Sequence, residues 1–328
     1  MTTNDAEAWT KVQEQVAALR SEIAKVIVGQ RAVVDLMLVS LLCRGHCLIV
    51  GVPGLAKTLL VSTLGRILGL TFRRIQFTPD LMPMDIVGSE ILQESATGGR
   101  REFQFAPGPV FANLILADEI NRTPPKTQAA LLEAMQEKQV TVAGRTMRLE
   151  EPFIVYATQN PIEHEGTYPL PEAQLDRFFF NVLIDYPSVG DEREIVLRTT
   201  GRAVAEAARV TTPAEVLALQ DAVTDVPMPD HVLDYILRLA GASRPDSPLA
   251  DGYVKQYVAW GAGPRASQNL TRAAKASALL QGRPAASVEE VRQMAKPILR
   301  HRVIPNYNAT GEGISAETIV DHLLEKVE

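Results

Sequence analysis

The residues best suited to chemistry lie in a short glycine-containing loop that ends in a lysine and a threonine. Residues 51–58 read GVPGLAKT, follow the apolar run Cys47–Val50 and open a helical pattern over Lys57–Leu68. Backbone N–H groups of such a loop, together with the positive end of a helix, bind phosphate groups. We expect Lys57 to reach the β- and γ-phosphates of a nucleotide and Thr58 to bind Mg²⁺. The predicted phosphate-binding residues are Gly51, Pro53, Gly54, Leu55, Ala56, Lys57 and Thr58.

Two acids at the end of an apolar run form the second candidate. Residues 114–117 read LILA and lead directly into Asp118 and Glu119. A carboxylate at the carboxyl end of a buried parallel strand lies where open α/β sheets bind their ligands. We expect Asp118 to hold Mg²⁺ through water and Glu119 to act as the general base on the attacking water.

Two further polar residues flank strand-like runs. Asn160 follows the run 153–158 and would orient the attacking water, although an Asn-Pro pair is also typical of a plain turn. Arg177 precedes the run 178–184 and would neutralise charge on the transferred phosphoryl group, a role that a neighbouring subunit can supply. The alternative for Arg177 is a surface ion pair with Asp176.

The candidates at the ends of apolar runs require a sheet of parallel strands that positions them. Short apolar runs alternate with helical patterns, which is typical of an α/β domain with strands covered on both faces. The predicted strands are Cys47–Val50, 71–77, 114–117, 153–158 and 178–184. Two hairpins interrupt this pattern, one over 90–94 and 101–105 that turns at 97–99, and one over Gln139–Val142 and 146–149 that turns at 143–145.

The pattern becomes helical after Tyr186-Pro187-Ser188. Thr212 with Glu215, and Ser287 with Glu290, have the spacing of capping boxes, in which a hydroxyl and a carboxylate satisfy the first N–H groups of a helix. We predict two domains: residues 1–188 form an N-terminal helix and an α/β nucleotide-binding domain, and residues 189–328 form an all-α domain.

Composition limits the classes of protein. The 328 residues include 33 Lys and Arg against 39 Asp and Glu, a net charge of −6 that disfavours a wholly basic nucleic-acid binder. Two cysteines, Cys43 and Cys47, exclude a disulfide scaffold and a four-cysteine zinc site, and we expect both to be buried. The most apolar stretch, 32–52, is interrupted by charged residues, so we expect no membrane span and a cytoplasmic location. The pair Arg73-Arg74 is interpreted as a solvated face.

Taken together, these motifs resemble an AAA+ ATPase, and several local strings are similar to the MoxR family. The strings are 28–30 (VGQ), 51–58 with Ala56, 118–122 (DEINR), 157–161, 171–178 and 263–266 (GPRA). Ala56 replaces the glycine of the general phosphate-loop motif but matches the version in this family. The added methyl group is compatible with the loop if residue 56 has helical dihedrals. The resemblance extends from about residue 15 to the end of the chain.

The resemblance implies a fold and roles for individual residues. The fold would be a P-loop AAA+ module, a five-stranded parallel sheet with helix-2 and pre-sensor-1 hairpin inserts, followed by an all-α lid. Val28 and Gly29 would line the adenine pocket, and residues 51–58 and Asp118-Glu119 would be Walker A and Walker B. Asn160 would be sensor 1.

The resemblance also implies arginines that act between subunits. Arg177 resembles the arginine finger, which acts on the nucleotide of the next subunit, and Arg122 is its rival. Arg265 resembles the sensor 2 arginine, and the sequence leaves open whether it acts on its own subunit's nucleotide or on a neighbour's.

The implied function is Mg²⁺-dependent ATP hydrolysis by a homo-oligomeric ring, expected to be a hexamer. Such a ring would be a chaperone-like remodeller of protein clients that works with a von Willebrand factor A-domain protein. The alternative is a DNA-dependent motor, which needs basic hairpin tips. The second hairpin offers only Lys138, Arg145 and Arg148, so we do not expect nucleic-acid binding. The set Lys57, Asp118, Glu119 and Asn160 also disfavours a scaffold that binds ATP without hydrolysing it.

Overall fold

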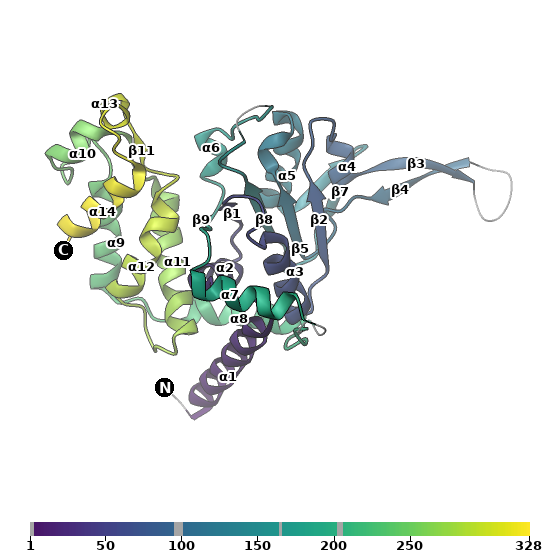
Figure 1. The fold of residues 1–328 in the computed structure, drawn as a ribbon, viewed down its shortest axis with the longest axis horizontal. Coiled ribbons are helices and arrows are strands. Elements are labelled where there is room, and N and C mark those ends of the chain that lie inside the picture. Colours follow the sequence, from purple (N-terminus) through teal and green to yellow (C-terminus); the bar gives the residue numbers. More distant parts are fainter. Residues whose placement is uncertain (1–2, 95–100, 164–165, 202–205) are drawn as a thin grey trace.

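The first part of the chain is built around one five-stranded parallel sheet (Figure 1). The computed structural model describes residues 3–94, 101–163, 166–201 and 206–328. The strands of this sheet are β1 (Cys47–Val50), β2 (Phe72–Gln76), β5 (Leu114–Asp118), β8 (Ile154–Gln159) and β9 (Phe180–Leu183). Their order is β2-β5-β8-β1-β9, and every pair is parallel. The prediction of five parallel strands is confirmed, although β9 is shorter than expected because Phe178 N–H bonds to Leu175 O in a preceding turn.

Strand β5 is buried on both faces, as its uninterrupted apolar sequence predicts. On β5, Leu114 and Leu116 belong to one buried cluster, whereas Ile115 and Ala117 belong to the other. Adjacent side chains of a strand point to opposite faces, so a continuous apolar run indicates helices on both sides. β1 ends in this double core, which therefore holds the start of the phosphate loop rigidly.

Helices cover each face of the sheet. They are α1 (Thr3–Val26), α2 (Arg31–Leu42), α3 (Lys57–Leu68), α4 (Pro83–Val87), the 3₁₀ turn η1 (Ile120–Arg122), α5 (Pro125–Glu137) and α6 (Glu172–Leu175). Apolar residues of α1, α2 and α3 enter the first cluster, and those of α4 and α5 enter the second. Cys43 and Cys47 are buried and free, as expected.

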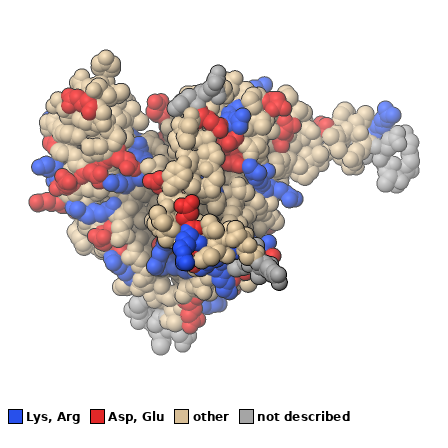
Figure 2. Space-filling model, viewed as in Figure 1, with Lys and Arg blue, Asp and Glu red and all other residues tan. Residues whose placement is uncertain are grey.

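Two antiparallel hairpins extend from this domain. β3 (Gly88–Glu94) pairs with β4 (Arg101–Pro107), and β6 (Gln139–Val142) pairs with β7 (Arg145–Arg148). Both hairpins were predicted, while the expected turn at 97–99 lies outside the described residues. The β3–β4 hairpin projects as a long arm (Figure 1), and Figure 2 shows few charged residues along its visible described surface. Leu92 and Phe103 face each other across this arm and are 50% and 67% exposed.

The second part of the chain is helical. Its helices are α7 (Val189–Thr199), α8 (Pro213–Asp225), α9 (Asp230–Ala242), α10 (Gly252–Tyr257), α11 (Pro264–Leu280), α12 (Val288–Leu299), α13 (Tyr307–Gly311) and α14 (Ala316–Lys326). A short ladder joins β10 (Val258–Trp260) to β11 (Ile304–Pro305). Both predicted capping boxes are confirmed, at Thr212 with Glu215 and at Ser287 with Glu290.

The helical part is packed against the sheet. Leu270 of α11 and Ile298 of α12 belong to the same buried cluster as Ile49 of β1. The division of the chain at residue 188 stays a prediction, although α7 begins directly after it. Across the described residues, every helix is too short or too polar to cross a membrane.

Candidate nucleotide site

The loop 51–56 joins β1 to the amino end of α3, as the motif predicts. A Cβ at Gly51 would lie 2.8 Å from Ile184 O, so this close approach to the end of β9 excludes a side chain. Gly54 has a φ of 86°, a conformation that residues with a side chain rarely adopt. The space around its Cα is open, so a ligand can approach the backbone there. The first N–H groups of α3 have no partners within the helix, which makes this helix end an anion site.

Ala56 has a conformation that the sequence did not predict. It is the N-cap of α3 and has φ 55° and ψ 23°, in the left-handed region. The condition under which the methyl group would fit the loop without strain, helical dihedrals at residue 56, is therefore not met, because the loop reverses its handedness one residue before the helix. A left-handed conformation costs a residue with a Cβ roughly 1–2 kcal/mol. The loop thus stores a small local strain beside Lys57.

Lys57 lies close to the two acids. Its Nζ donates a hydrogen bond to Gly51 O at 2.6 Å, and the side chain is half-buried. Burial lowers the pKa of Lys57, and the negative charges of Asp118, Glu119 and Glu163 oppose that shift. The structure therefore brings the predicted phosphate lysine and the predicted Walker B acids into one electrostatic environment.

Asp118 is held by a threonine and an arginine. Thr158 Oγ1 donates to Asp118 Oδ1 at 2.6 Å, while Arg74 Nη2 and Nε donate to Oδ2 at 2.5 and 3.1 Å. Arg74 is exposed, as the interpretation of a solvated face predicts, and the pairing of β2 with β5 also brings its guanidinium to the carboxylate of Asp118. A guanidinium thus neutralises Asp118 in the structure.

Glu119 is also fixed by side chains from two elements. Gln76 Nε2 donates to Glu119 Oε2 at 2.8 Å, and Arg122 Nη1 donates to the same oxygen at 3.0 Å. This hydrogen bond to Glu119 raises the pKa of Arg122. The Glu119 N–H donates to Thr158 Oγ1 at 2.8 Å, so Thr158 orients both acids. Neither Gln76 nor Thr158 has a local sequence signal; only the strand register places them here.

The donor set fits a magnesium nucleotide. Mg²⁺ prefers oxygen ligands and is usually bound by one or two carboxylates together with phosphate oxygens. Asp118 and Thr58 supply a carboxylate and a hydroxyl, and the end of α3 supplies N–H groups for the phosphates. Because Asp118 already accepts the cationic Arg74, its surroundings accommodate a positive charge.

Asn160 lies one residue beyond β8, next to the start of the phosphate loop. Gln159, the last residue of β8, pairs with Val50 at the end of β1, and Gly51 N–H donates to Gln159 O at 3.2 Å. Asn160 is buried, and its Oδ1 accepts the N–H of Ile162 at 3.2 Å. The turn interpretation is thus correct for the amide oxygen, and the amide NH₂ remains the group that could orient a water molecule.

Val28 and Gly29 lie between α1 and α2, beside the start of α7. A Cβ on Gly29 would lie 2.9 Å from Cγ of Asp191 in α7, so the two segments are in contact. Both residues line a cavity of about 480 Å³ between α1, α2 and α7. Since Gly51 abuts Ile184, the connection from β9 to α7 passes both the phosphate loop and this segment.

Arg177 and Arg265 lie at the other edge of the sheet. β9 starts at Phe180 opposite Cys47, so Arg177 precedes the amino end of β9, whereas the phosphate loop follows the carboxyl end of β1. A four-residue strand is about 13 Å long, so the two edges lie about that far apart. Arg265 Nη1 donates to Asp176 Oδ2 at 2.7 Å, which places Arg265 beside the Arg177 turn.

Asp176 does not pair with Arg177. Its carboxylate instead binds Arg265 and Arg302, each at 2.7 Å, so the alternative interpretation of Arg177 as half of a surface pair is wrong. Arg177 is half-buried and has no ion pair or side-chain hydrogen bond within the described part of the chain. Of the three candidate arginines, Arg122 is engaged at its own chain's site and Arg177 is unpaired.

The fold and the site define a P-loop ATPase of the AAA+ class. Two family models match the chain: the ATPase family associated with various cellular activities (AAA) over residues 46–180, and the AAA lid domain over residues 251–323. A solved structure from Cytophaga hutchinsonii, described as a candidate ATPase, superposes with a TM-score of 0.93 at 40% identity. The superposition covers 99% of this chain and 98% of that one.

Two curated relatives identify the family. Chaperone MoxR1 of Mycobacterium tuberculosis is 46% identical over 93% of this chain and 80% of its own length. Protein MoxR of Paracoccus denitrificans is 30% identical over 96% of this chain and 95% of its own length. The chain therefore belongs to the MoxR family of AAA+ ATPases, as its sequence motifs indicated.

Proposed function

We propose that this ATPase is Mg²⁺-dependent and works as a closed ring, in which each nucleotide site is completed by Arg177 and Arg265 of the adjacent subunit. The observation that carries this proposal is the separation of the candidate residues between two edges of one sheet. Lys57, Asp118 and Glu119 share the carboxyl edge, and both arginines lie about a strand's length away. An arginine at that distance serves a nucleotide only by facing the next subunit, and a hexamer is the ring size we expect.

The residues of the carboxyl edge divide the chemistry. The loop N–H groups and Lys57 would bind and orient the phosphates, and Val28 and Gly29 would contact the adenine. Bound through Asp118 and Thr58, Mg²⁺ would neutralise charge on the phosphate oxygens.

Glu119 and Asn160 would act on the water itself. Glu119 would accept the proton of the attacking water, while the NH₂ group of Asn160 donates a hydrogen bond to that water. Because Gln76 and Arg122 share one oxygen of Glu119, the other oxygen remains available for the proton. Arg177 of the neighbour would stabilise the charge on the transferred phosphoryl group.

The biological task that we propose is remodelling of protein clients. The similarity to a relative named as a chaperone supports this task, as does the net charge of −6, which disfavours DNA. A von Willebrand factor A-domain partner and a cytoplasmic location complete the proposal. The projecting β3–β4 arm, with Leu92 and Phe103 exposed, offers an apolar surface for a client or a partner.

The test compares Arg177→Ala with Arg122→Ala as protein concentration is raised. ATPase activity per wild-type subunit should rise with concentration as rings form. Arg177→Ala should bind nucleotide normally and yet lose roughly 10³-fold or more of the ring's turnover. Arg122→Ala should lose less, because Arg122 pairs with Glu119 of its own chain. Turnover by Arg177→Ala at the wild-type rate would overturn the proposal.

A further inference from the structure

Asp176 is the point where the Arg177 turn meets the lid. Its two carboxylate oxygens accept from different lid segments: Oδ2 from Arg265 at the start of α11, and Oδ1 from Arg302 after α12, each at 2.7 Å. Asp176 ends α6 and immediately precedes Arg177, whose N–H is held by Gln174 O at 3.2 Å. One carboxylate therefore links both predicted intersubunit arginines.

Arg302 is buried and all of its donors are used. Its side chain is 2% exposed, and its Nε donates to Asp176 Oδ1. Its Nη1 donates to the carbonyl oxygens of Phe179 and Ile298, and its Nη2 to those of Asp176 and Phe178, over 2.6–3.3 Å. Burial lowers the pKa of Arg302 to about 10, and its hydrogen bond to the Asp176 carboxylate opposes that shift. A guanidinium with five N–H groups matched to acceptors fixes the geometry of the main chain around it.

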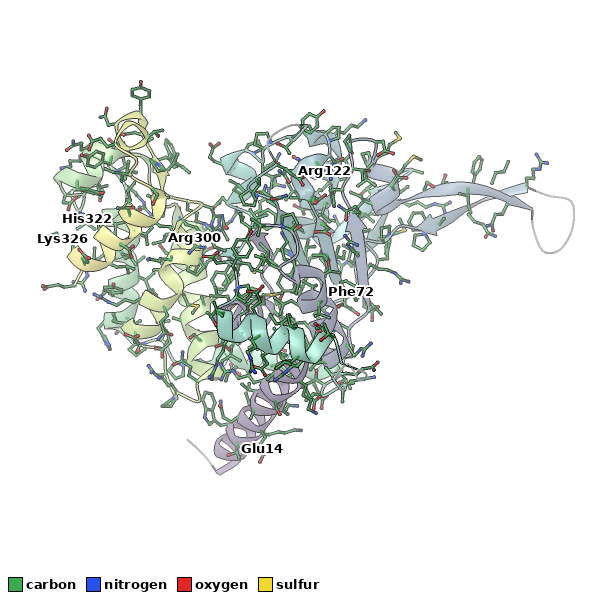
Figure 3. All side chains as sticks on the ribbon, viewed as in Figure 1. Glu14, Phe72, Arg122, Arg300, His322 and Lys326 are labelled. Atoms are coloured by element: carbon green, nitrogen blue, oxygen red, sulfur yellow. The ribbon has the colours of Figure 1, made fainter. Side chains whose placement is uncertain are left out.

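The neighbours of Arg302 strengthen the same junction. Arg300 Nη1 donates to Asn181 O of β9 at 3.1 Å, and His301 Nε2 lies 3.1 Å from Phe178 O. Figure 3 labels Arg300 on the side of the lid that faces the sheet. Three consecutive lid residues thus bind the turn and the first residues of β9, so the lid is attached to the chain directly beside Arg177.

We propose that Asp176 and Arg302 are positioning residues that join the Arg177 turn to the lid, so that Arg177 and Arg265 move as a unit with the lid of their own subunit. This inference rests on the proposed function, in which both arginines act on a neighbour's nucleotide. Its consequence is a direct route between sites: a lid movement that follows nucleotide binding in one subunit repositions two cations at the next subunit's phosphates.

The test is Asp176→Asn, with Asp321→Asn as the matched control. Asp176 is 36% exposed at its side chain, so the variant should fold, and Asp321 is a lid carboxylate in an exposed ion pair with Lys296 at 2.8 Å. Asp176→Asn should keep nucleotide affinity in its own subunit and reduce kcat of the ring roughly ten- to hundredfold, since small displacements of a catalytic group have effects of this size. Asp321→Asn should match the wild-type ring in both quantities.

Mixed rings separate positioning from general damage. Lys57→Ala subunits cannot bind the phosphates but keep the whole Arg177 junction, so adding them to Asp176→Asn subunits should restore part of the lost turnover. Arg302→Lys should resemble Asp176→Asn if it folds, because lysine keeps the charge and loses the planar set of donors.

Two results would overturn the inference, and both differ from the result that would overturn the proposed function. If Asp176→Asn and Asp321→Asn rings both turn over at the wild-type rate while Arg177→Ala rings do not, the arginine acts in the ring but Asp176 does not position it. If Lys57→Ala subunits fail to rescue Asp176→Asn while they rescue Arg177→Ala, the defect of Asp176→Asn lies in its own site. Wild-type turnover by Arg177→Ala rings would instead contradict the proposed function.

Discussion

At the carboxyl edge of the sheet, two acids are surrounded by local cations, whereas at the amino edge one acid holds two arginines in place. Asp118 accepts hydrogen bonds from Arg74, and Glu119 accepts one from Arg122. At this edge the carboxylates are the candidate reactive groups, and the arginines are their counter-ions. Asp176 reverses the roles, because it binds Arg265 and Arg302 and leaves Arg177 without an ion pair among the described residues. The same residue types thus build the candidate nucleotide site at one edge and, in the proposed ring, would supply cations from the other.

The two edges differ in how much of a nucleotide site one chain supplies. The carboxyl edge has a phosphate loop, a lysine and two oriented acids, all from one chain. The amino edge has a rigidly held arginine with no acceptor within the described residues. In the proposed ring, Arg177 would meet the phosphates of a nucleotide that is bound to the next subunit.

The largest effect within the carboxyl edge is expected from Glu119→Gln. Glutamine keeps the hydrogen bond to Arg122 but cannot accept the proton, so hydrolysis should fall roughly 10²- to 10⁴-fold while ATP binding persists. Single-turnover hydrolysis with labelled ATP measures this directly. The same variant should still activate Arg177→Ala neighbours, because its amino edge is intact. Wild-type turnover by Glu119→Gln would remove this residue as the base.

An intermediate effect is expected from Arg74→Met, which removes the counter-ion of Asp118. Mg²⁺ and Arg74 would compete for the same carboxylate, so the variant should bind Mg·ATP more tightly, by roughly two- to fivefold, as expected for the loss of one partly exposed ion pair. Titration of a fluorescent ATP analogue at several Mg²⁺ concentrations measures this affinity. Arg73→Met is the control from the same strand, and equal affinities for the two variants would show that Arg74 does not compete.

The smallest effect is expected from Ala56→Gly, which relieves the left-handed alanine. The relief of about 1–2 kcal/mol is partly offset by the greater freedom of glycine in the unfolded chain, so the net stabilisation should be at most about 1 kcal/mol. The midpoint of thermal unfolding without nucleotide should stay equal or rise slightly. A clear fall in that midpoint would mean that residue 56 is not strained in the free protein.

The sequence predicted the parts of the site that depend on local pattern. The phosphate loop, the strand before Asp118 and both hairpins follow from apolar runs and glycines within a few residues of each other. Arg302 could not be predicted, because its partner Asp176 is 126 positions away and Arg302 itself belongs to no motif. Arg74 was missed for a related reason: a basic pair has no local signal that tells a solvated face from a counter-ion, and only the register of β2 with β5 decides.

The most direct test of the account mixes two inactive variants, Arg177→Ala and Lys57→Ala, and measures ATPase activity. An Arg177→Ala subunit keeps a complete carboxyl edge, and a Lys57→Ala neighbour offers it an intact Arg177. We expect the mixture to regain a substantial fraction of wild-type turnover, although each variant alone is inactive. A mixture that stays inactive under conditions where mixed rings form would contradict the claim that the two edges of the sheet serve different subunits.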